Sequence, residues 1–295
     1  MLPPMRQRLI IAAAVAVGAI AWLAASPPLR AADGSVGLSL TTARVGLVLA
    51  VPIVVVAGLP AALAALVASA SGNPLSGVFA AATSLCVLAG RGGSISGWVY
   101  RADARLPDDF AFLIVEMVFW SVYLVAVVAG ILFLRDRLRD RVPVLAFDKR
   151  AAPALVLGRN HLHSVAACLL CALIAGILLC VLLRSIDGGQ IVWALILAFV
   201  LAAVVTQMIV PTAGSWAVLL SPAVVAVVAY AWVLLRFDSE ASYLQAWIRV
   251  GRTASAVPGP ALALPIHYAS AGVVGCTIGL GWAQSLIRAR AHGGG

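Results

Sequence analysis

The stretch SVAACLLCALIAGILLCVLL, residues 164–183, decides the fold class of this chain because it contains no charged residue. A helix that spans a bilayer needs about 20 predominantly apolar residues. The whole chain is 63% hydrophobic and only 11% charged, whereas soluble domains are about 45–50% apolar and 25% charged. The stretch and the composition together predict a helical integral membrane protein.

Seven further apolar segments lie on either side of this stretch. Their residues are 9–25, 45–70, 74–90, 110–134, 191–210, 216–235 and 262–287. The sequence therefore predicts an all-α polytopic bundle of about eight transmembrane helices, forming a single domain over 1–295. The signal is strongest in 110–134 and in the four segments that follow it.

Two of the segments have a second interpretation. Segment 9–25 follows Arg6 and Arg8 and leads into small residues and prolines, a pattern also typical of a cleaved signal peptide. Segment 74–90 contains glycine, serine and threonine, and a re-entrant hairpin is allowed where other parts of the protein cover it. Its start is well marked, because Asn73 can cap a helix and Pro74 suits the first helical position. We interpret both segments as spans.

The orientation of the bundle follows from the basic loop 135–163, which contains seven Lys and Arg residues. Loops rich in Lys and Arg stay in the cytoplasm. With eight spans, both termini are then cytoplasmic, and the protein is expected in the cytoplasmic (inner) membrane. Arginines at the start of the loop would also attract anionic lipid head groups; they are Arg135, Arg137, Arg139 and Arg141.

Composition and motifs disfavour several other classes of protein. The net charge is +9, but the arginines lie between apolar runs and do not form the basic face that binds nucleic acid, so no nucleic-acid partner is expected. The chain has no P-loop, no H-E-x-x-H and no G-x-S-x-G motif, so no cofactor and no known catalytic signature is predicted. The five cysteines lie inside apolar runs, which argues against a disulfide scaffold.

Glu116 is the strongest functional candidate, because ionisable groups inside a span are costly and usually functional. It lies six residues after Phe110, about 9 Å along the helix axis. His267 is expected at a similar depth in the last span, so the two side chains could share a proton if their helices are neighbours. Tyr268 and Arg44 are expected near the same layer, as is Arg91. The alternative is a purely structural hydrogen-bonded pair, or two unrelated groups.

The stretch RNHLHSVAACLLC, residues 159–171, contains an H-x-H-x4-C-x2-C pattern that could bind a metal. On a helix, His161, Cys168 and Cys171 share one face, while His163 points elsewhere. A tetrahedral zinc site would need a fourth ligand from another element. We therefore predict no metal site, and interpret these residues as interfacial histidines and apolar cysteines.

Small residues repeat at every fourth position along the last span and form a strip on one helix face. The strip consists of Ala271, Gly275, Gly279 and Ala283. Small residues allow two helices to approach closely, and the pattern serves an intramolecular contact or a homodimer equally well.

Three functional classes remain open on this evidence. A permease-like or translocation component for a small or lipid-like solute predicts a water-accessible path to Glu116. An accessory or scaffold subunit of a membrane complex predicts a dry bundle with an apolar side face. A small intramembrane enzyme that uses Glu116 and His267 on a lipid-like substrate predicts both side chains within hydrogen-bond reach of a common cleft. We favour the first class slightly over the second, and expect that the chain is not an enzyme.

Overall fold

The computed structural model describes residues 4–24, 58, 74–91, 95, 108–138, 161–184, 187–211, 216–248 and 257–293. Helix accounts for 92% of these residues, and no strand occurs among them. The predicted all-α class is therefore confirmed. Arg44, the loop residues Arg139 and Arg141, and the predicted segment 45–70 apart from Gly58 lie outside the described residues.

Five helices are long and apolar enough to cross a membrane, and they match the five strongest predicted segments. Three of them lie in α5 (Asp109–Leu138), α6 (His161–Leu182) and α7 (Gly188–Ile209). The fourth combines α8 (Trp216–Leu219) with α9 (Ser221–Arg236). The fifth runs through α11 (Pro265–His267), the π-helical turn η5 (Tyr268–Gly272) and α12 (Val273–Gly293). These helices indicate a membrane-embedded protein, while the count of eight spans stays a prediction.

The two ambiguous segments form shorter apolar helices, α1 (Pro4–Ala24) and α3 (Pro74–Arg91). Pro74 begins α3, as its position predicts. α1 packs along α3, and its Trp22 is fully buried, with its ring centroid 6.0 Å from that of Trp120 on α5.

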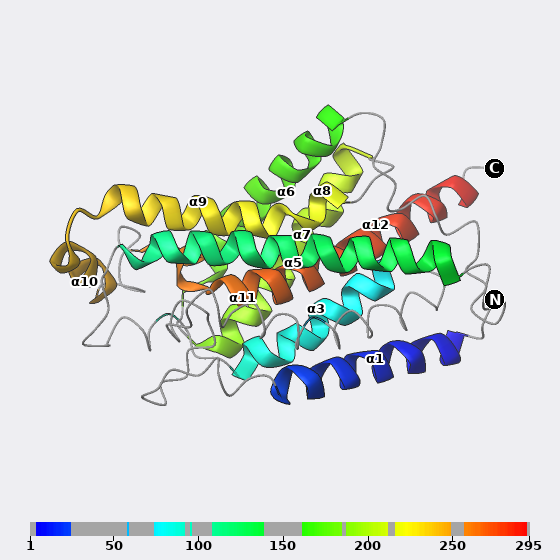
Figure 1. Ribbon diagram of the computed structural model, residues 1–295. Helices are drawn as coiled ribbons and strands as arrows, with labels where there is room; N and C mark the ends of the chain where they lie inside the picture. The colour runs from blue at the N-terminus through cyan, green and yellow to red at the C-terminus, as the bar shows by residue number, and fades with distance from the viewer. Residues whose placement is uncertain are drawn as a thin grey trace.

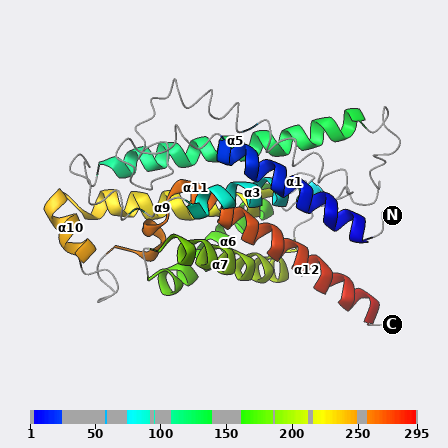
Figure 2. The same ribbon diagram turned by 90° about the horizontal axis from the view of Figure 1, so that it is seen from below.

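The helices form an elongated bundle in which α12 lies along α7, α5 pairs with α9, and α3 contacts both α1 and α12 (Figure 1). At one end, α10 (Glu240–Ile248) inserts Tyr243 between the rings of Phe110 and Phe237. The start of α1, the end of α5 and the end of α12 lie together at the opposite end (Figure 2). This is the arrangement required if the basic loop and both termini share one side of the membrane.

Large apolar side chains are exposed on the outer faces of the long helices. On α6, for example, Leu169, Leu173 and Ile177 follow one another at every fourth position and are exposed. A soluble protein rarely exposes such a continuous stripe. A lipid bilayer is the environment that accommodates it.

Candidate functional site

Glu116 is buried inside the bundle, with only 3% of its surface exposed. It lies on α5, and one turn further along, the indole Nε1–H of Trp120 donates a hydrogen bond of 3.1 Å to its Oε1. The indole is itself packed among the rings of Trp22, Phe119 and Tyr123. The carboxylate therefore has a donor whose position is fixed by the packing of its ring.

His267 is fully buried at the start of the last span and serves as a helix cap. Its Nδ1 accepts a 3.1 Å hydrogen bond from the backbone N–H of Leu264, the residue just before the helix. Its Nε2 faces the backbone carbonyl of Ala89 on α3 without completing a hydrogen bond of good geometry. The bond to Leu264 fixes Nε2 as the protonated nitrogen of the neutral ring, because Nδ1 acts as the acceptor.

Glu116 and His267 lie on neighbouring elements, since α5 contacts α11, as their proposed pairing requires. Glu116 accepts a hydrogen bond from the indole N–H of Trp120, and His267 accepts one from the backbone N–H of Leu264. The two side chains thus have separate partners rather than a shared proton. Of the other residues predicted in this layer, Tyr268 is described, whereas Arg44 and the side chain of Arg91 lie outside the described part of the chain.

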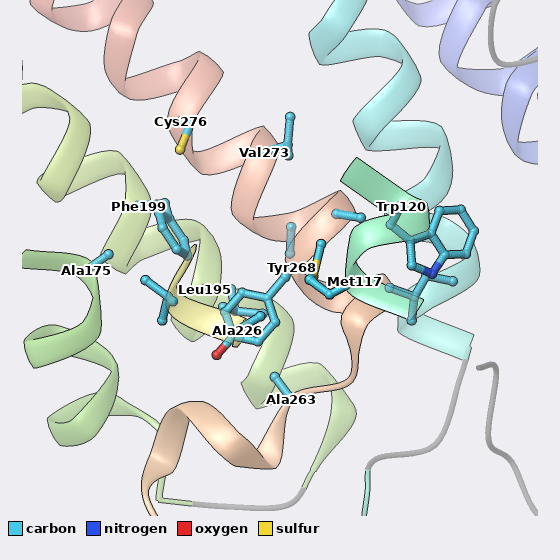
Figure 3. Packing of buried hydrophobic residues seen from close by; sticks show 14 of the residues in the cluster. Met117, Trp120, Ala175, Leu195, Phe199, Ala226, Ala263, Tyr268, Val273 and Cys276 are labelled. Atoms are coloured by element: carbon cyan, nitrogen blue, oxygen red, sulfur yellow. The ribbon is translucent and has the colours of Figure 1, made fainter. Parts of the chain in front are cut away.

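Tyr268 holds down the chain segment that precedes the last span, residues 257–264, which we call the connecting segment. Its hydroxyl donates to the carbonyl oxygen of Pro260 at 2.7 Å, and the Tyr230 hydroxyl donates to the carbonyl oxygen of Ala263. Figure 3 shows Tyr268 extending from the helix toward this segment, with Cys276 further along the same helix. The two tyrosines donate to backbone carbonyls of a segment that is not regular α-helix, and such donors stabilise irregular backbone inside a membrane bundle.

The connecting segment is almost entirely buried and includes the short 3-10 helix η4 (Gly259–Leu262). A Cβ atom on Gly259 would lie 2.6 Å from the carbonyl oxygen of Leu183 and 2.7 Å from that of Leu179. Only glycine therefore fits against the end of α6. The last span consequently begins at Pro265 rather than at Leu262, where the sequence pattern places it.

The small-residue strip of the last span faces α7. A Cβ atom on Gly275 would lie 2.6 Å from the carbonyl oxygen of Ile196. Ala271 and Ala283 are also fully buried. Of the two alternatives left by the sequence, the structure shows the intramolecular contact at Gly275 and Gly279.

The cysteines predicted as weak metal ligands are buried, and a further thiol lies beside them. Cys171 on α6 approaches Ser221 on α9 and Cys276 on α12. Sequence analysis did not connect these three residues, because they come from separate spans and no spacing rule links them. Within the described residues, no group of three or more His, Cys, Asp or Glu side chains is placed to hold a metal; the side chain of His161 lies outside that part.

The fold and the site define a helical membrane protein in which the buried carboxylate of Glu116 lies next to a span that contains a π-helical turn. Comparison with protein-family models, with curated proteins and with solved structures gives no match for this chain. Its function must therefore be argued from its own residues.

Proposed function

We propose that this protein is a permease-like or translocation component that moves a small or lipid-like solute across the cytoplasmic membrane. The observation that supports this most strongly is the buried carboxylate of Glu116 on α5, next to a span that contains a π-helical turn inside the bundle. A charged group in such a place is costly and marks solute or proton pathways. Single π-helical turns inside α-helices are also frequent at functional sites.

The connecting segment is the element that we expect to move during transport. It is attached to the bundle by two hydroxyl-to-carbonyl hydrogen bonds, from Tyr230 and Tyr268. Such bonds contribute about 1 kcal/mol each and can exchange rapidly. Release of this segment would uncover the start of the last span near Glu116, which is closed to solvent in the described conformation.

The orientation that we propose places the basic ends of the bundle in the cytoplasm. The start of α1 and the ends of α5 and α12 lie at one end of the bundle, and the predicted lipid-binding arginines lie in the last turns of α5 or after it. Arg135 and Arg137 lie within the last turns of α5, and Arg139 and Arg141 come after it. Glu116 and His267 then lie in the outer half of the membrane.

A non-catalytic accessory subunit is the second candidate. The exposed apolar stripe on α6 favours it, because a partner helix could cover this stripe as well as lipid can. The intramembrane enzyme is less well supported, since it requires His267 to act with Glu116, and His267 is engaged as a helix cap.

Thiol labelling of Glu116→Cys distinguishes the first two candidates. All five native cysteines are replaced by serine, and a membrane-impermeant maleimide is added to sealed vesicles of either orientation. Translocation predicts labelling from the outer side. Leu124→Cys, two turns further along α5 and also buried, is the matched control and should remain unlabelled.

The opposite result would favour the accessory subunit. If Glu116→Cys stays unlabelled from both sides while the protein elutes as a folded species, no water path reaches this position. Equal labelling of both cysteines would indicate a loosened bundle, and would also contradict a specific path.

A further inference from the structure

Two thiols from different spans meet at one hydroxyl group in the interior of the bundle. Cys171 Sγ on α6 lies 3.3 Å from Ser221 Oγ, and Cys276 Sγ on α12 lies 3.6 Å from the same oxygen. All three residues are fully buried, and both cysteines are free. We call Cys171 and Cys276 the thiol pair.

Three polar groups lie beside the thiol pair: the Ser221 hydroxyl, the Val218 carbonyl and the Thr206 hydroxyl. Ser221 Oγ also lies 2.7 Å from the carbonyl oxygen of Val218, and the Cys276 thiol donates to that oxygen at 3.4 Å. Thr206, on α7, is fully buried and faces Cys171, yet its Oγ1 completes no hydrogen bond. An unsatisfied hydroxyl in an apolar interior costs free energy. Its position beside the sulfur indicates a ligand that would use it.

The number of thiols limits which ligand fits. Zinc requires four ligands in structural sites, and no group of three metal-binding side chains assembles within the described residues. A disulfide requires the two sulfur atoms about 2.05 Å apart and closely spaced backbones. However, α12 packs mainly on α7, while α6 packs on α7 and α9. A metal ion that bridges two sulfurs spans a longer distance and leaves the helices in place.

We propose that Cys171 and Cys276 bind one soft monovalent cation, Cu(I), between two thiolates inside the membrane bundle. Soft thiolate ligands select Cu(I) over the hard cations, and this ion accepts two-coordinate binding. Two sulfur–hydrogen bonds break, two sulfur–copper bonds form, and each thiol releases its proton to water. The copper keeps its oxidation state, so no oxidant or reductant is needed.

The hydroxyl groups of Ser221 and Thr206 would stabilise the charge of this complex. Two thiolates and one monovalent cation leave one negative charge in an apolar environment. Hydrogen bonds to a charged acceptor are about twice as strong as neutral ones, and Ser221 and Thr206 are placed to donate them. Thr206 Oγ1, which completes no hydrogen bond in the described structure, would then gain an acceptor.

A further thiol lies on the same helix. Cys168 comes one turn before Cys171 on α6 and is also buried. His163, nearer the start of the helix, is exposed. Cys168 and Cys171 thus place two soft ligands one turn apart on α6. This inference does not depend on the proposed transport function.

The test is titration of the purified full-length chain with Cu(I), supplied without oxygen as its bicinchoninate complex. The chain should remove one Cu(I) from the coloured complex, and each of Cys171→Ser and Cys276→Ser should abolish this. Cys180→Ser is the matched control, because Cys180 lies on the same helix but is exposed, and it should bind as the unsubstituted protein does. Ser221→Ala should weaken binding by about 10- to 100-fold, as loss of an outer-sphere hydrogen bond does.

A second measurement needs no substitution and so does not depend on variant folding. Cu(I) bound to the unsubstituted protein should have two sulfur ligands and no nitrogen ligand, as read by X-ray absorption spectroscopy. The proposal is overturned if the chain leaves the copper complex unchanged. It is also overturned if either single serine variant binds normally, or if the spectrum shows a nitrogen ligand or more than two sulfur ligands.

Discussion

Gly279 on α12 contacts the backbone of α7 so closely that an added Cβ atom would lie 2.5 Å from the carbonyl oxygen of Val200. Gly275 makes the equivalent approach to Ile196 one turn earlier. Without a hydrophobic driving force between helices in lipid, close backbone contact of this kind is a main source of association. The contact between α12 and α7 is therefore where the bundle should be most sensitive to added volume.

We expect Gly279→Ala to destabilise the protein by about 1–3 kcal/mol, the range observed when a methyl group is forced into a packed core. The displaced atoms are backbone, so they cannot rotate away. Gly281→Ala is the matched control, because a Cβ atom there meets nothing within 4 Å. The measurement is the unfolding midpoint in detergent, and equal midpoints for the two variants would contradict the described contact.

Trp120→Phe should also be destabilising, by about 1–3 kcal/mol, because it removes a hydrogen-bond donor from a buried carboxylate. In a Glu116→Leu background, Trp120→Phe should lower the free energy of unfolding by less, because no carboxylate is left to lose its hydrogen-bond donor. Unfolding of the two single variants and the double variant gives the coupling energy. Trp193→Phe is the control, because Trp193 is exposed on α7. A coupling energy near zero would show that the hydrogen bond contributes nothing.

Replacing both Tyr230 and Tyr268 by phenylalanine should loosen the connecting segment, since two buried carbonyls lose their donors. We expect faster amide hydrogen exchange in residues 257–264, with a cost of about 1–3 kcal/mol for each unsatisfied group. Tyr123→Phe is the control, because the Tyr123 hydroxyl is buried without a hydrogen-bond partner. Its removal should be neutral or slightly stabilising. Unchanged exchange in the double variant would mean that the tyrosines do not hold the segment.

His267→Leu should cost about 1–2 kcal/mol more than His267→Gln, although both roughly keep the volume of the ring. Glutamine can still accept the Leu264 N–H, as Glu or Gln commonly does at the third helical position, whereas leucine cannot. The comparison of unfolding midpoints separates a capping role from a role in proton transfer. If both variants retain full stability, the cap is not important for the start of the last span.

Sequence reasoning located the long helices because each depends only on its own apolar length. Segment 110–134 and those after it needed no knowledge of their neighbours, and Pro74 marked the start of α3 by its fixed backbone angle. The depth of Glu116 followed from counting residues along one helix. In the same way, the small-residue strip was recognisable from its spacing.

Contacts between spans could not be predicted in this way. The sequence predicted that His267 and Glu116 lie at a similar depth in the membrane. The hydrogen-bond partner of each, however, depends on the directions of side chains on several helices. Cys276 and Ser221 were not linked to Cys171 for the same reason. The connecting segment was also missed, because PGPALALP is apolar enough to resemble the start of a helix, and only the tyrosine contacts show that it is not one.

The π-helical turn at residues 268–272 has a consequence for the ancestry of this span. A π turn closes hydrogen bonds one residue later than an α-helix does, so it behaves as a one-residue insertion in otherwise regular helix. Each residue added to or removed from a helix rotates one side of it by about 100° relative to the other. Deleting one residue here would give a regular α-helix whose glycine face still fits α7, while α11, with His267 and its bond to Leu264, would rotate away from its contacts with α3 and α5. A single-residue deletion would thus convert the π-helical start of this span into an ordinary transmembrane α-helix.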